Sequence, residues 1–412
     1  MSTGVSYSIR LATAVGVTLA MLATSAQAQE IMNRGAVTGV KVAPGNSNRI
    51  DFANARAMAL PQATEAVSAQ AEQDLISNLV NRFQASAATD SGQVAGSEGD
   101  GSALNAIDLD TSSEAINTQA GGEFETQEHG TSNHPFSTAK ADLRNLNGTA
   151  HPTNFTYPYS PSGKLFFNIG SSTFVCSASL IKKGVVVTAA HCVAEFGSRT
   201  RFYTNFRFVP GYRNGVGNTA PSPGNWAVSQ AWVMSSYING VAGQCAATAP
   251  GVVCKDDVAV LELTRKSTIP NYPGTVTGWY GYGWNRFGFT STGLTHITQT
   301  GYPVGLDFGQ LMQRNDSQGF IASSTLVNNT VIGSLMTGGS SGGPWLLNFG
   351  IRPTLNGTAN GSFPNPNIVI GVTSWGYVSS AIKQQGASPF TSTNIVPLVN
   401  AACASSDPRC AP

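Results

Sequence analysis

Short apolar runs, broken by glycine, proline and asparagine, make up most of the chain after about residue 150. Each run has the length of one strand; examples are residues 165–169, 176–181, 185–188, 206–209, 258–263 and 368–372. A helical period, with apolar residues three and four positions apart, appears there only in Thr393–Ala402. The pattern predicts an all-β protein with one C-terminal helix.

Residues 29 to about 135 are instead rich in alanine, serine, glycine, glutamine and aspartate. In Leu75–Phe83 the apolar residues are spaced so that they share one helix face, which predicts a single amphipathic helix. Most of the remainder, especially Ser86–Ser132, is poor in apolar residues and is interpreted as a flexible linker. We therefore expect this part to be mostly irregular.

The charges divide at the same place. Between Gln29 and Phe136 there are 14 acidic and 5 basic residues, a net charge of −9, whereas the part from Ser137 onward has 17 basic and 8 acidic residues, a net charge of +9. Opposite charges of this size indicate two structural units, of which the acidic one can dock on the basic one. The basic residues are scattered, which does not favour nucleic-acid binding.

The composition narrows the class of protein. With 41% hydrophobic and 11% charged residues, most of the chain is expected to fold. No apolar run reaches the roughly 18 residues of a membrane-spanning helix.

At the start, Arg10, the apolar stretch Leu11–Leu22 and the small residues Ser25–Ala28 form an export signal, with cleavage expected after Ala28. The protein is thus predicted to be secreted, either to the extracellular space or to the periplasm.

The cysteines agree with an oxidising compartment. The six cysteines form three local pairs along the chain: Cys176 with Cys192, Cys245 with Cys254, and Cys403 with Cys410. Since no C-x-x-C motif occurs, three structural disulfides are favoured over a zinc site. We expect neither a metal ion nor another cofactor.

Three motifs carry candidate chemistry. The strand-like run Val185–Thr188 leads to His191, and a disulfide between Cys176 and Cys192 would hold that imidazole in place as a general base requires. Asp257, at the start of an apolar run, suits the partner that orients the imidazole and stabilises its charged form. The neighbouring Asp256 is expected to face solvent.

The third motif is Gly338–Trp345, in which Ser341 lies among four glycines and precedes Gly-Pro. The glycines would let the backbone turn so that the Ser341 hydroxyl projects and the N–H groups of Gly339 and Ser341 converge as an oxyanion hole. The motif also fits the nucleophile elbow of lipases, but that fold places its histidine after the serine, and no histidine follows Ser341.

The order His191, Asp257, Ser341, with the residues around each, resembles the trypsin/chymotrypsin family of serine proteases. Gly371–Gly376 resembles the strand of that family that pairs with substrate backbone, and Tyr157–Leu165 and Gly301–Pro303 are similar to its secreted, glutamyl-endopeptidase-like bacterial branch. The resemblance covers about residues 150–403.

The resemblance implies two six-stranded antiparallel β-barrels with the active site between them. It makes Ser341 the nucleophile, His191 the general base and then acid, and Asp257 the residue that orients His191. The chain then divides into a signal peptide (1–28), an acidic propeptide (29–135) and a protease domain (136–412), with barrels at about 150–268 and 269–403. The propeptide is expected to be removed between about residues 130 and 150 and to act as inhibitor or folding aid.

Specificity follows from two departures from the family pattern. Trypsins carry an aspartate for Lys or Arg where this chain has Leu335, and the glutamyl specialists carry a histidine where it has Thr373. The pocket residues are expected to be Leu335, Met336, Ser374, Trp375 and Gly376, which favour uncharged side chains. In addition, Ser340 replaces the aspartate that binds the new N-terminus of activated trypsins.

The prediction is a monomeric serine endopeptidase whose partners are polypeptide substrates and its own propeptide, with no nucleic-acid or membrane partner. The alternative is a catalytically inactive binding protein with a protease fold. An adhesive exoprotein is a second alternative, based on the Gly-rich aromatic stretch Gly278–Phe289.

Overall fold

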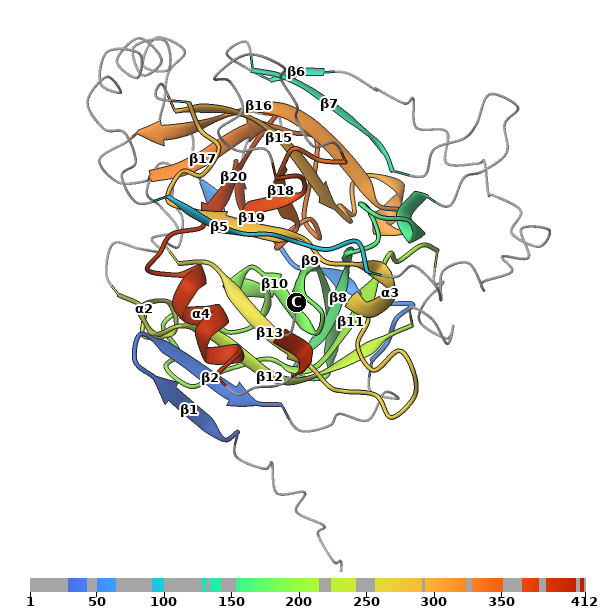
Figure 1. The fold of residues 1–412 in the computed structure, drawn as a ribbon, viewed down its shortest axis with the longest axis vertical. Coiled ribbons are helices and arrows are strands. Elements are labelled where there is room, and N and C mark those ends of the chain that lie inside the picture. The colour runs from blue at the N-terminus through green and yellow to red at the C-terminus, as the bar shows by residue number, and fades with distance from the viewer. Residues whose placement is uncertain are drawn as a thin grey trace, which may run out of the picture.

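Figure 1 shows two β-barrels, one above the other, in a computed structural model of the chain. The structure describes residues 29–42, 50–63, 91–99, 128–130, 134–141, 153–214, 224–241, 256–290, 293–323, 328–350, 365–377, 383–404 and 408–410. The expected signal peptide, the expected helix Leu75–Phe83 and the pair Cys245 and Cys254 lie outside these residues.

The first barrel consists of six antiparallel strands. They are β8 (Ser162–Ile169), β9 (Ser172–Lys182), β10 (Val185–Thr188), β11 (Thr204–Pro210), β12 (Trp226–Met234) and β13 (Ala259–Leu263). They pair in the order β12–β11–β8–β9–β10–β13, and β13 closes the barrel by pairing with β12.

The second barrel repeats this plan. Its strands are β15 (Leu294–Gly301), β16 (Gln313–Ser323), β17 (Asn328–Gly333), β18 (Pro344–Leu347), β19 (Ile368–Tyr377) and β20 (Gln384–Pro389). The order is β15–β18–β19–β20–β17–β16, and β16 closes the barrel on β15. The predicted fold, two six-stranded antiparallel barrels, is therefore confirmed. A further strand, β14 (Gly281–Trp284), pairs in parallel with β19.

Helices are few and short. The C-terminal helix α4 (Ile395–Ala402) packs against β12 and β13, and Asn394 caps it by accepting a hydrogen bond from the N–H of Ile395. The others are α2 (Ser235–Ile238), α3 (Gly274–Thr277) and the 3₁₀ turns η3 (Thr153–Phe155), η4 (Ala190–Cys192), η5 (Asp307–Gly309) and η6 (Pro408–Cys410). Within the described residues, no helix has the length and apolar character needed to cross a membrane.

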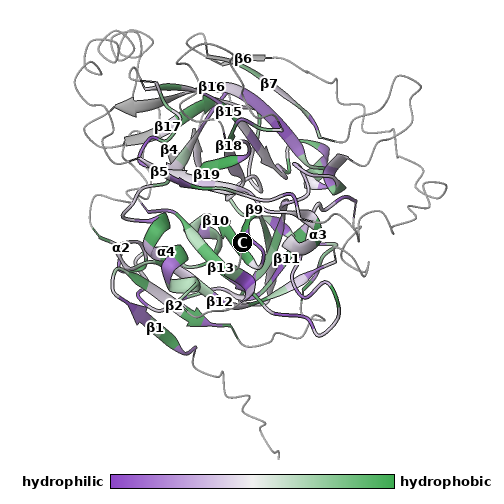
Figure 2. Ribbon diagram, in the orientation of Figure 1, coloured by the Kyte–Doolittle hydropathy of each residue, from purple (hydrophilic) through white to green (hydrophobic). Residues whose placement is uncertain are grey.

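The two barrels have different interiors. The first is filled by apolar residues, and most of its strands are green in Figure 2. The second has a smaller apolar cluster and, beside it, buried polar side chains that hydrogen-bond to one another. Its strands carry these polar residues, among them Gln299, Asn315, Thr373 and Gln385, at inward positions where an alternating pattern would call for apolar ones. These four side chains all have hydrogen-bond partners, so this interior depends on specific geometry that the apolar barrel does not require.

The N-terminal part contributes strands to both barrels. They are β1 (Ile31–Arg34), β2 (Val37–Lys41), β3 (Arg56–Ala57), β4 (Gln62–Ala63), β5 (Gly92–Val94), β6 (Glu128–Gly130) and β7 (His134–Lys140). The hairpin β1–β2 pairs with β12, β3 with β9, β4 with β19, β5 with β14, and β7 with β16. The linker interpretation is thus wrong for Gly92–Val94 and for Glu128–Gly130, which pairs with β7; in both, backbone pairing supplies the order that apolar side chains do not.

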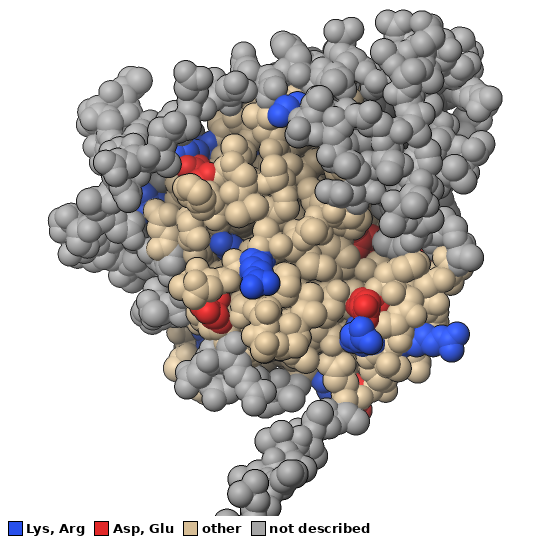
Figure 3. All heavy atoms as spheres, turned by 180° about the vertical axis from the view of Figure 1, so that it is seen from behind, with Lys and Arg blue, Asp and Glu red and all other residues tan. Residues whose placement is uncertain are grey.

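The hairpin β1–β2 is held on the first barrel mainly by burial of apolar side chains. Val37 and Val40 of β2 are fully buried in the core of the first barrel. The guanidinium of Arg34 donates a hydrogen bond to the carbonyl of Ala401 and lies 4.8 Å from the centre of the Trp232 ring. Glu30 pairs with Lys41 of the same hairpin. Figure 3 likewise shows the charged residues of one face scattered rather than gathered.

Lys164 of β8 joins the two barrels from a buried position. Its ammonium group donates to the carbonyl of Gly309 in η5 at 2.7 Å, and burial lowers the pKa of Lys164 from 10.5 to about 7. Between these two values the unfolded chain binds more protons than the folded chain, so the free energy of unfolding rises with pH across this window.

We predict that Lys164→Met, in a Ser341→Ala background, removes part of this rise. Between pH 7 and pH 9.5 the free energy of unfolding should increase less in the variant than in its parent, by about 1–3 kcal/mol. Urea denaturation at both pH values measures the difference. Lys183→Met serves as the control and should leave the slope unchanged; equal slopes in all three proteins would contradict the prediction.

Candidate active site

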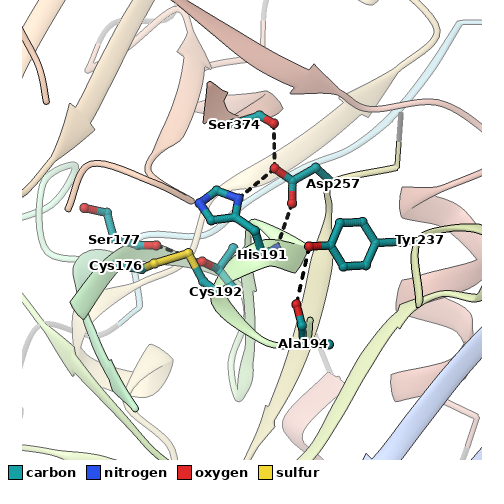
Figure 4. A network of polar contacts seen from close by, with 9 residues as sticks. Cys176, Ser177, His191, Cys192, Ala194, Tyr237, Asp257 and Ser374 are labelled. Carbon is teal, nitrogen blue, oxygen red and sulfur yellow. Dashed lines mark hydrogen bonds and ion pairs between the residues drawn. A yellow bond between two sulfur atoms is a disulfide. The ribbon is translucent and has the colours of Figure 1, made fainter. Parts of the chain in front are cut away.

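Asp257 and His191 lie side by side in the interior, next to the junction of the barrels (Figure 4). Asp257 precedes β13, and His191 lies in η4, the turn that follows β10. The carboxylate accepts two hydrogen bonds from this one residue: Oδ1 from the backbone N–H of His191 and Oδ2 from its Nδ1, each at 2.8 Å. Since a carboxylate only accepts, the ring proton belongs on Nδ1, which leaves Nε2 without a proton in the neutral imidazole.

A third donor comes from the second barrel. The hydroxyl of Ser374 on β19 donates to Oδ2 of Asp257 at 2.5 Å. Ser374 was expected only as a substrate-binding residue, so this contact was missed. Asp257 is fully buried, so its carboxylate has no water around it. Its three hydrogen bonds take the place of that hydration.

Asp256 does not face solvent, so that expectation is wrong. It is buried, its φ is +66°, and Oδ2 accepts a hydrogen bond from the hydroxyl of Ser236 at 2.6 Å. The left-handed backbone at Asp256 turns its side chain toward α2 while Asp257 turns toward His191. The two acids thus have separate partners.

Tyr237 of α2 lines the same region (Figure 4). Burial, followed by the negative charge of Asp257, raises the pKa of Tyr237 well above its ordinary value. Tyr237 is therefore a neutral phenol, and its hydroxyl donates to the carbonyl of Ala194 at 3.3 Å. Tyr237 thus packs beside Asp257 without adding a second negative charge.

The disulfide Cys176–Cys192 fastens the turn that carries His191 to β9. Cys403 and Cys410 form the second described disulfide. Cys176, His191 and Cys192 place their ligand atoms within 4.8 Å of one another, but both sulfurs are consumed by the disulfide. Neither is a thiolate, so this group is a poor metal site.

Ser341 lies in a turn that only glycine permits. Gly339 and Gly342, on either side, have φ values of +93° and +79°. A Cβ atom at Gly342 would come within 2.0 Å of the Thr188 hydroxyl oxygen, and one at Gly339 within 2.6 Å of the Tyr302 carbonyl oxygen. The glycine-rich motif is thus explained by backbone conformation and close packing.

One backbone hydrogen bond joins this turn to the first barrel. The N–H of Ser177 on β9 donates to the carbonyl of Ser341 at 2.7 Å. The Ser177 hydroxyl also donates to the carbonyl of Gly339 and accepts from the N–H of Tyr302, each at 2.9 Å. Ser177 therefore holds the serine turn at a fixed place relative to β9, beside Cys176. Sequence reasoning missed it, since nothing in its neighbours marks a polar bridge.

His191 Nε2 and Ser341 Oγ are the two atoms expected to react, and both are buried without a hydrogen-bond partner among the described residues. Buried polar atoms of this kind are rare and call for an explanation. The imidazole has its tautomer and orientation set, and the hydroxyl lies on the adjacent turn, but no bond connects the two in this arrangement. Such bonds often tighten only when a substrate is bound.

The N–H of Gly339 is already directed at a carbonyl group. It donates to the carbonyl of Met58, in the N-terminal part, at 3.2 Å. The preceding peptide is held in this orientation because the carbonyl of Gly338 accepts a hydrogen bond from the N–H of Val304 at 2.8 Å. One donor of the expected oxyanion hole is thus oriented and occupied by a carbonyl oxygen.

A neutral polar network lies behind the turn. Gln385 Nε2 donates to the carbonyl of Met336 at 2.6 Å and to the Ser340 hydroxyl at 3.3 Å. Gln299 Nε2 donates to Gln385 Oε1 at 2.7 Å and to the Thr373 hydroxyl at 2.8 Å. The Ser340 hydroxyl in turn donates to the carbonyl of Thr337 at 2.7 Å. Where trypsins have an ion pair at Ser340, this chain has uncharged hydrogen bonds.

The expected pocket residues lie close to this network. Met336 and Trp375 are buried and Leu335 is half-buried, and Ser374 and Gly376 flank Trp375 on β19. A Cβ atom at Gly386 of β20 would lie within 1.9 Å of the Trp375 ring, so the indole packs on that glycine. The hydroxyl of Thr373 accepts hydrogen bonds from Gln299 and Trp345 inside the barrel and donates one to the carbonyl of Gly343 in the serine turn.

The chain belongs to the trypsin family: the family model described as Trypsin matches residues 155–396, more than half of its length. Trypsin-family proteins are serine proteases, and the fold and the disulfides agree with that class. A comparison with curated proteins finds no match.

Among solved structures, the protease Anisep from Arthrobacter nicotinovorans is 25% identical, with a TM-score of 0.45, and the match covers 60% of this chain and 96% of Anisep. The thermostable serine protease AL20 from an extremophilic microorganism is 23% identical, with a TM-score of 0.46 and coverage of 60% and 99%. A Glu endopeptidase in complex with MPD is 20% identical, with a TM-score of 0.42 and coverage of 68% and 98%.

The position of the Cys176–Cys192 disulfide predicts that its loss affects both stability and catalysis. Cys176→Ala/Cys192→Ala, which opens a loop with a sequence separation of 16, should lower the free energy of unfolding by about 2–4 kcal/mol and should lower kcat, because the His191 turn loses its tie to β9. Cys403→Ala/Cys410→Ala is the matched control and should lower stability alone. Unfolding curves and kcat of both variants test this; a kcat that falls equally in the two would refute it.

Proposed function

We propose that this protein is a secreted serine endopeptidase that hydrolyses peptide bonds through a Ser341–His191–Asp257 triad and an acyl-enzyme. The single observation that carries the proposal is the pair of hydrogen bonds from His191 to the buried carboxylate of Asp257, beside a serine on a glycine turn. This arrangement leaves Nε2 free to accept a proton and keeps the opposite charge of the carboxylate within reach of the imidazolium.

The reaction proceeds by two acyl transfers. Ser341 Oγ rotates toward His191 Nε2, gives up its proton and attacks the carbonyl carbon of the substrate. The N–H groups of Gly339 and Ser341 stabilise the negative oxygen of the tetrahedral intermediate. His191 then returns the proton to the leaving amine, and a water molecule, deprotonated by Nε2, hydrolyses the ester on Ser341.

The competing proposal is a catalytically inactive binding protein on the same fold. It would be favoured if one of the three triad residues were missing, or if His191 had no carboxylate beside it. All three residues are present, and Asp257 is hydrogen-bonded to the ring of His191. The endopeptidase therefore remains the better supported of the two.

Processing and location form part of the proposal. We infer that residues 1–28 direct export, that residues 29–135 are a propeptide, and that removal of the propeptide between about residues 130 and 150 releases the protease domain, residues 136–412, as a monomer. The similarity of Tyr157–Leu165 to the secreted bacterial branch supports this interpretation.

The proposed specificity is for uncharged side chains. The residues assigned to the pocket, Leu335 and Met336, are apolar, and the network behind them is neutral. Thr373 uses its hydroxyl inside the barrel, so it does not substitute for the histidine of glutamate-specific enzymes. A charged substrate side chain would therefore be buried without a partner, which is costly.

We predict that Ser341→Ala and His191→Ala each lower kcat by about 10⁶-fold, because the triad acts as a unit. Asp257→Asn should lower kcat by about 10⁴-fold by favouring the wrong imidazole tautomer. Asp256→Asn is the matched control: it keeps a hydrogen-bonding partner for Ser236 and should cost far less. The measurements are kcat on a peptide substrate and labelling of Ser341 by a fluorophosphonate.

Two results would contradict the proposal. If the processed wild type labels no better than Ser341→Ala, the protein is not a serine hydrolase. If Asp256→Asn is more damaging than Asp257→Asn, the wrong aspartate has been assigned.

The neutral pocket predicts a cleavage profile. On a peptide library, the processed enzyme should prefer uncharged residues on the amino side of the cleaved bond, because neither Leu335 nor Met336 can pair with a charge. Mass spectrometry of the products measures this preference. A profile dominated by Lys, Arg or Glu would show that other residues form the pocket.

A further inference from the structure

Residues 56–63, which we call the strap, cross the candidate active site from one barrel to the other. The strap begins on β9, where Arg56 and Ala57 pair in parallel with Phe174 and Val175. The N–H of Met58 then donates to the carbonyl of Val175 at 2.9 Å. Val175 is adjacent to Cys176, so the strap starts beside the disulfide that holds His191.

The strap next passes over the Ser341 turn. The carbonyl of Met58 accepts the hydrogen bond from the N–H of Gly339 at 3.2 Å, the donor assigned above to the oxyanion hole. The Cβ atom of Ala57 lies 3.7 Å from the Cβ positions built at Gly338 and Gly339. Little space therefore remains for another carbonyl group at this donor.

The strap ends on β19. The N–H of Gly376 donates to the carbonyl of Pro61 at 3.1 Å, and Gln62 and Ala63 pair in parallel with Gly376 and Tyr377. The side chain of Leu60 reaches to 3.5 Å from the Cβ position built at Gly376. The strap thus occupies the strand edge that the proposed function assigns to substrate backbone, and β4 is visible near β19 in Figure 2.

The direction of the strap is opposite to that required of a substrate. In the proposed reaction, the residues on the amino side of the cleaved bond lie on the second barrel, along β19 and the pocket at Leu335 and Met336. Those on the carboxyl side leave toward β9. The strap places its amino end on β9 and its carboxyl end on β19, and both pairings are parallel.

This direction has a chemical consequence at Met58. Its carbonyl oxygen accepts from the N–H of Gly339, and the chain continues from there to β19, so the amide nitrogen of Ala59 follows on that side rather than on the leaving-group side. The proton held by His191 would then be delivered away from the nitrogen that must leave. A peptide bound this way blocks the site without becoming a good substrate.

We propose that the strap is an intramolecular inhibitor that binds the active site in the reverse direction and keeps the full-length chain latent. The proposal rests on the proposed function and specifies how the propeptide acts on the same site. It accounts for the burial of Ser341 Oγ, because the strap covers the turn that carries it. Beyond Arg56, whose side chain is exposed, the strap is an extended, uncharged peptide, since residues 57–63 carry no charged side chain.

The hairpin β1–β2 anchors the strap. The hairpin pairs with β12 and buries Val37 and Val40 in the first barrel. It therefore holds the N-terminal part of the chain on that barrel. A cut between residues 130 and 150 would leave both the hairpin and the strap on the enzyme. Release of activity therefore requires that the N-terminal part dissociate or be cut again, beyond the cleavage that separates it from the protease domain.

The test uses the full-length chain and a matched pair of substitutions. Leu60→Asp places a charge where the strap contacts β19, and Ala59→Asp places the same charge on the neighbouring, exposed residue. After a short exposure to a fluorophosphonate, only the label on the full-length band is counted. Leu60→Asp should label at least about tenfold faster than the wild type, because tenfold corresponds to only about 1.4 kcal/mol of lost binding. Ala59→Asp should label within about twofold of the wild type.

Met58→Pro provides a second variant in case Leu60→Asp does not fold, as judged from its thermal unfolding. Proline removes the N–H that Val175 accepts and should also speed labelling. If the wild type labels as fast as both variants, the strap does not inhibit and the proposal is overturned. If no protein labels, processed or full-length, the serine hydrolase itself is refuted and the strap's role with it.

The direction of binding is tested separately by mass spectrometry of the full-length chain and its fragments. The bond between Met58 and Ala59 should stay intact while labelling of Ser341 proceeds. A cut at this bond that is present in the wild type and absent from Ser341→Ala would show that the strap binds as a substrate does, and would overturn the reversed orientation.

Discussion

The buried carboxylate of Asp257 is the constraint on which the candidate site depends. A charge removed from water requires donors around it, and this one receives three: two from His191 and one from Ser374. These donors come from the turn after β10 and from β19, so satisfying one carboxylate fixes the two barrels relative to each other. The hydrogen bond from Ser177 to the carbonyl of Ser341 fixes them a second time, at the serine turn.

The two barrels use different physics for this common task. The first supplies a rigid apolar body into which His191 and Asp257 are set by backbone turns. The second holds the Ser341 turn from within, through Gln299, Gln385 and Thr373. Neutral hydrogen bonds of this kind do not depend on a newly created N-terminus, so the turn can be in place before any cleavage. If the turn is already formed, the activity of the full-length chain has to be blocked in another way. A strap that covers the site is suited to do so.

The sequence predicted the barrels, and it marked His191, Asp257 and Ser341 as candidates, because both leave local signals. Strand-length apolar runs predict barrel strands, and a serine on a turn as tight as this one must have glycines such as Gly339 and Gly342 beside it. The polar interior of the second barrel left no such signal, since Gln299 and Gln385 find their partners 86 positions apart. Asp256 was misjudged for a similar reason: its partner Ser236 lies on an element of another segment.

The strap could not be recognised from the sequence for a more general reason. Its strands β3 and β4 have two residues each, too few for an alternating pattern, and their order comes from the edges of β9 and β19. Backbone pairing requires extended conformation but hardly constrains side-chain identity, so it leaves little trace in composition.

Because the strap binds through its backbone, it can occupy the site in the reversed orientation. Its backbone satisfies Val175, Gly339 and Gly376 in turn, and those are groups that a substrate would also engage. What differs is the order in which the chain reaches them. An inhibitor can make the same backbone hydrogen bonds as a substrate but with its chain running in the opposite direction. It then occupies the whole site. The carbonyl of Met58 faces the oxyanion donor, but no leaving nitrogen is within reach of His191. Latency then depends on chain direction, and the catalytic residues need not be distorted to remain inactive.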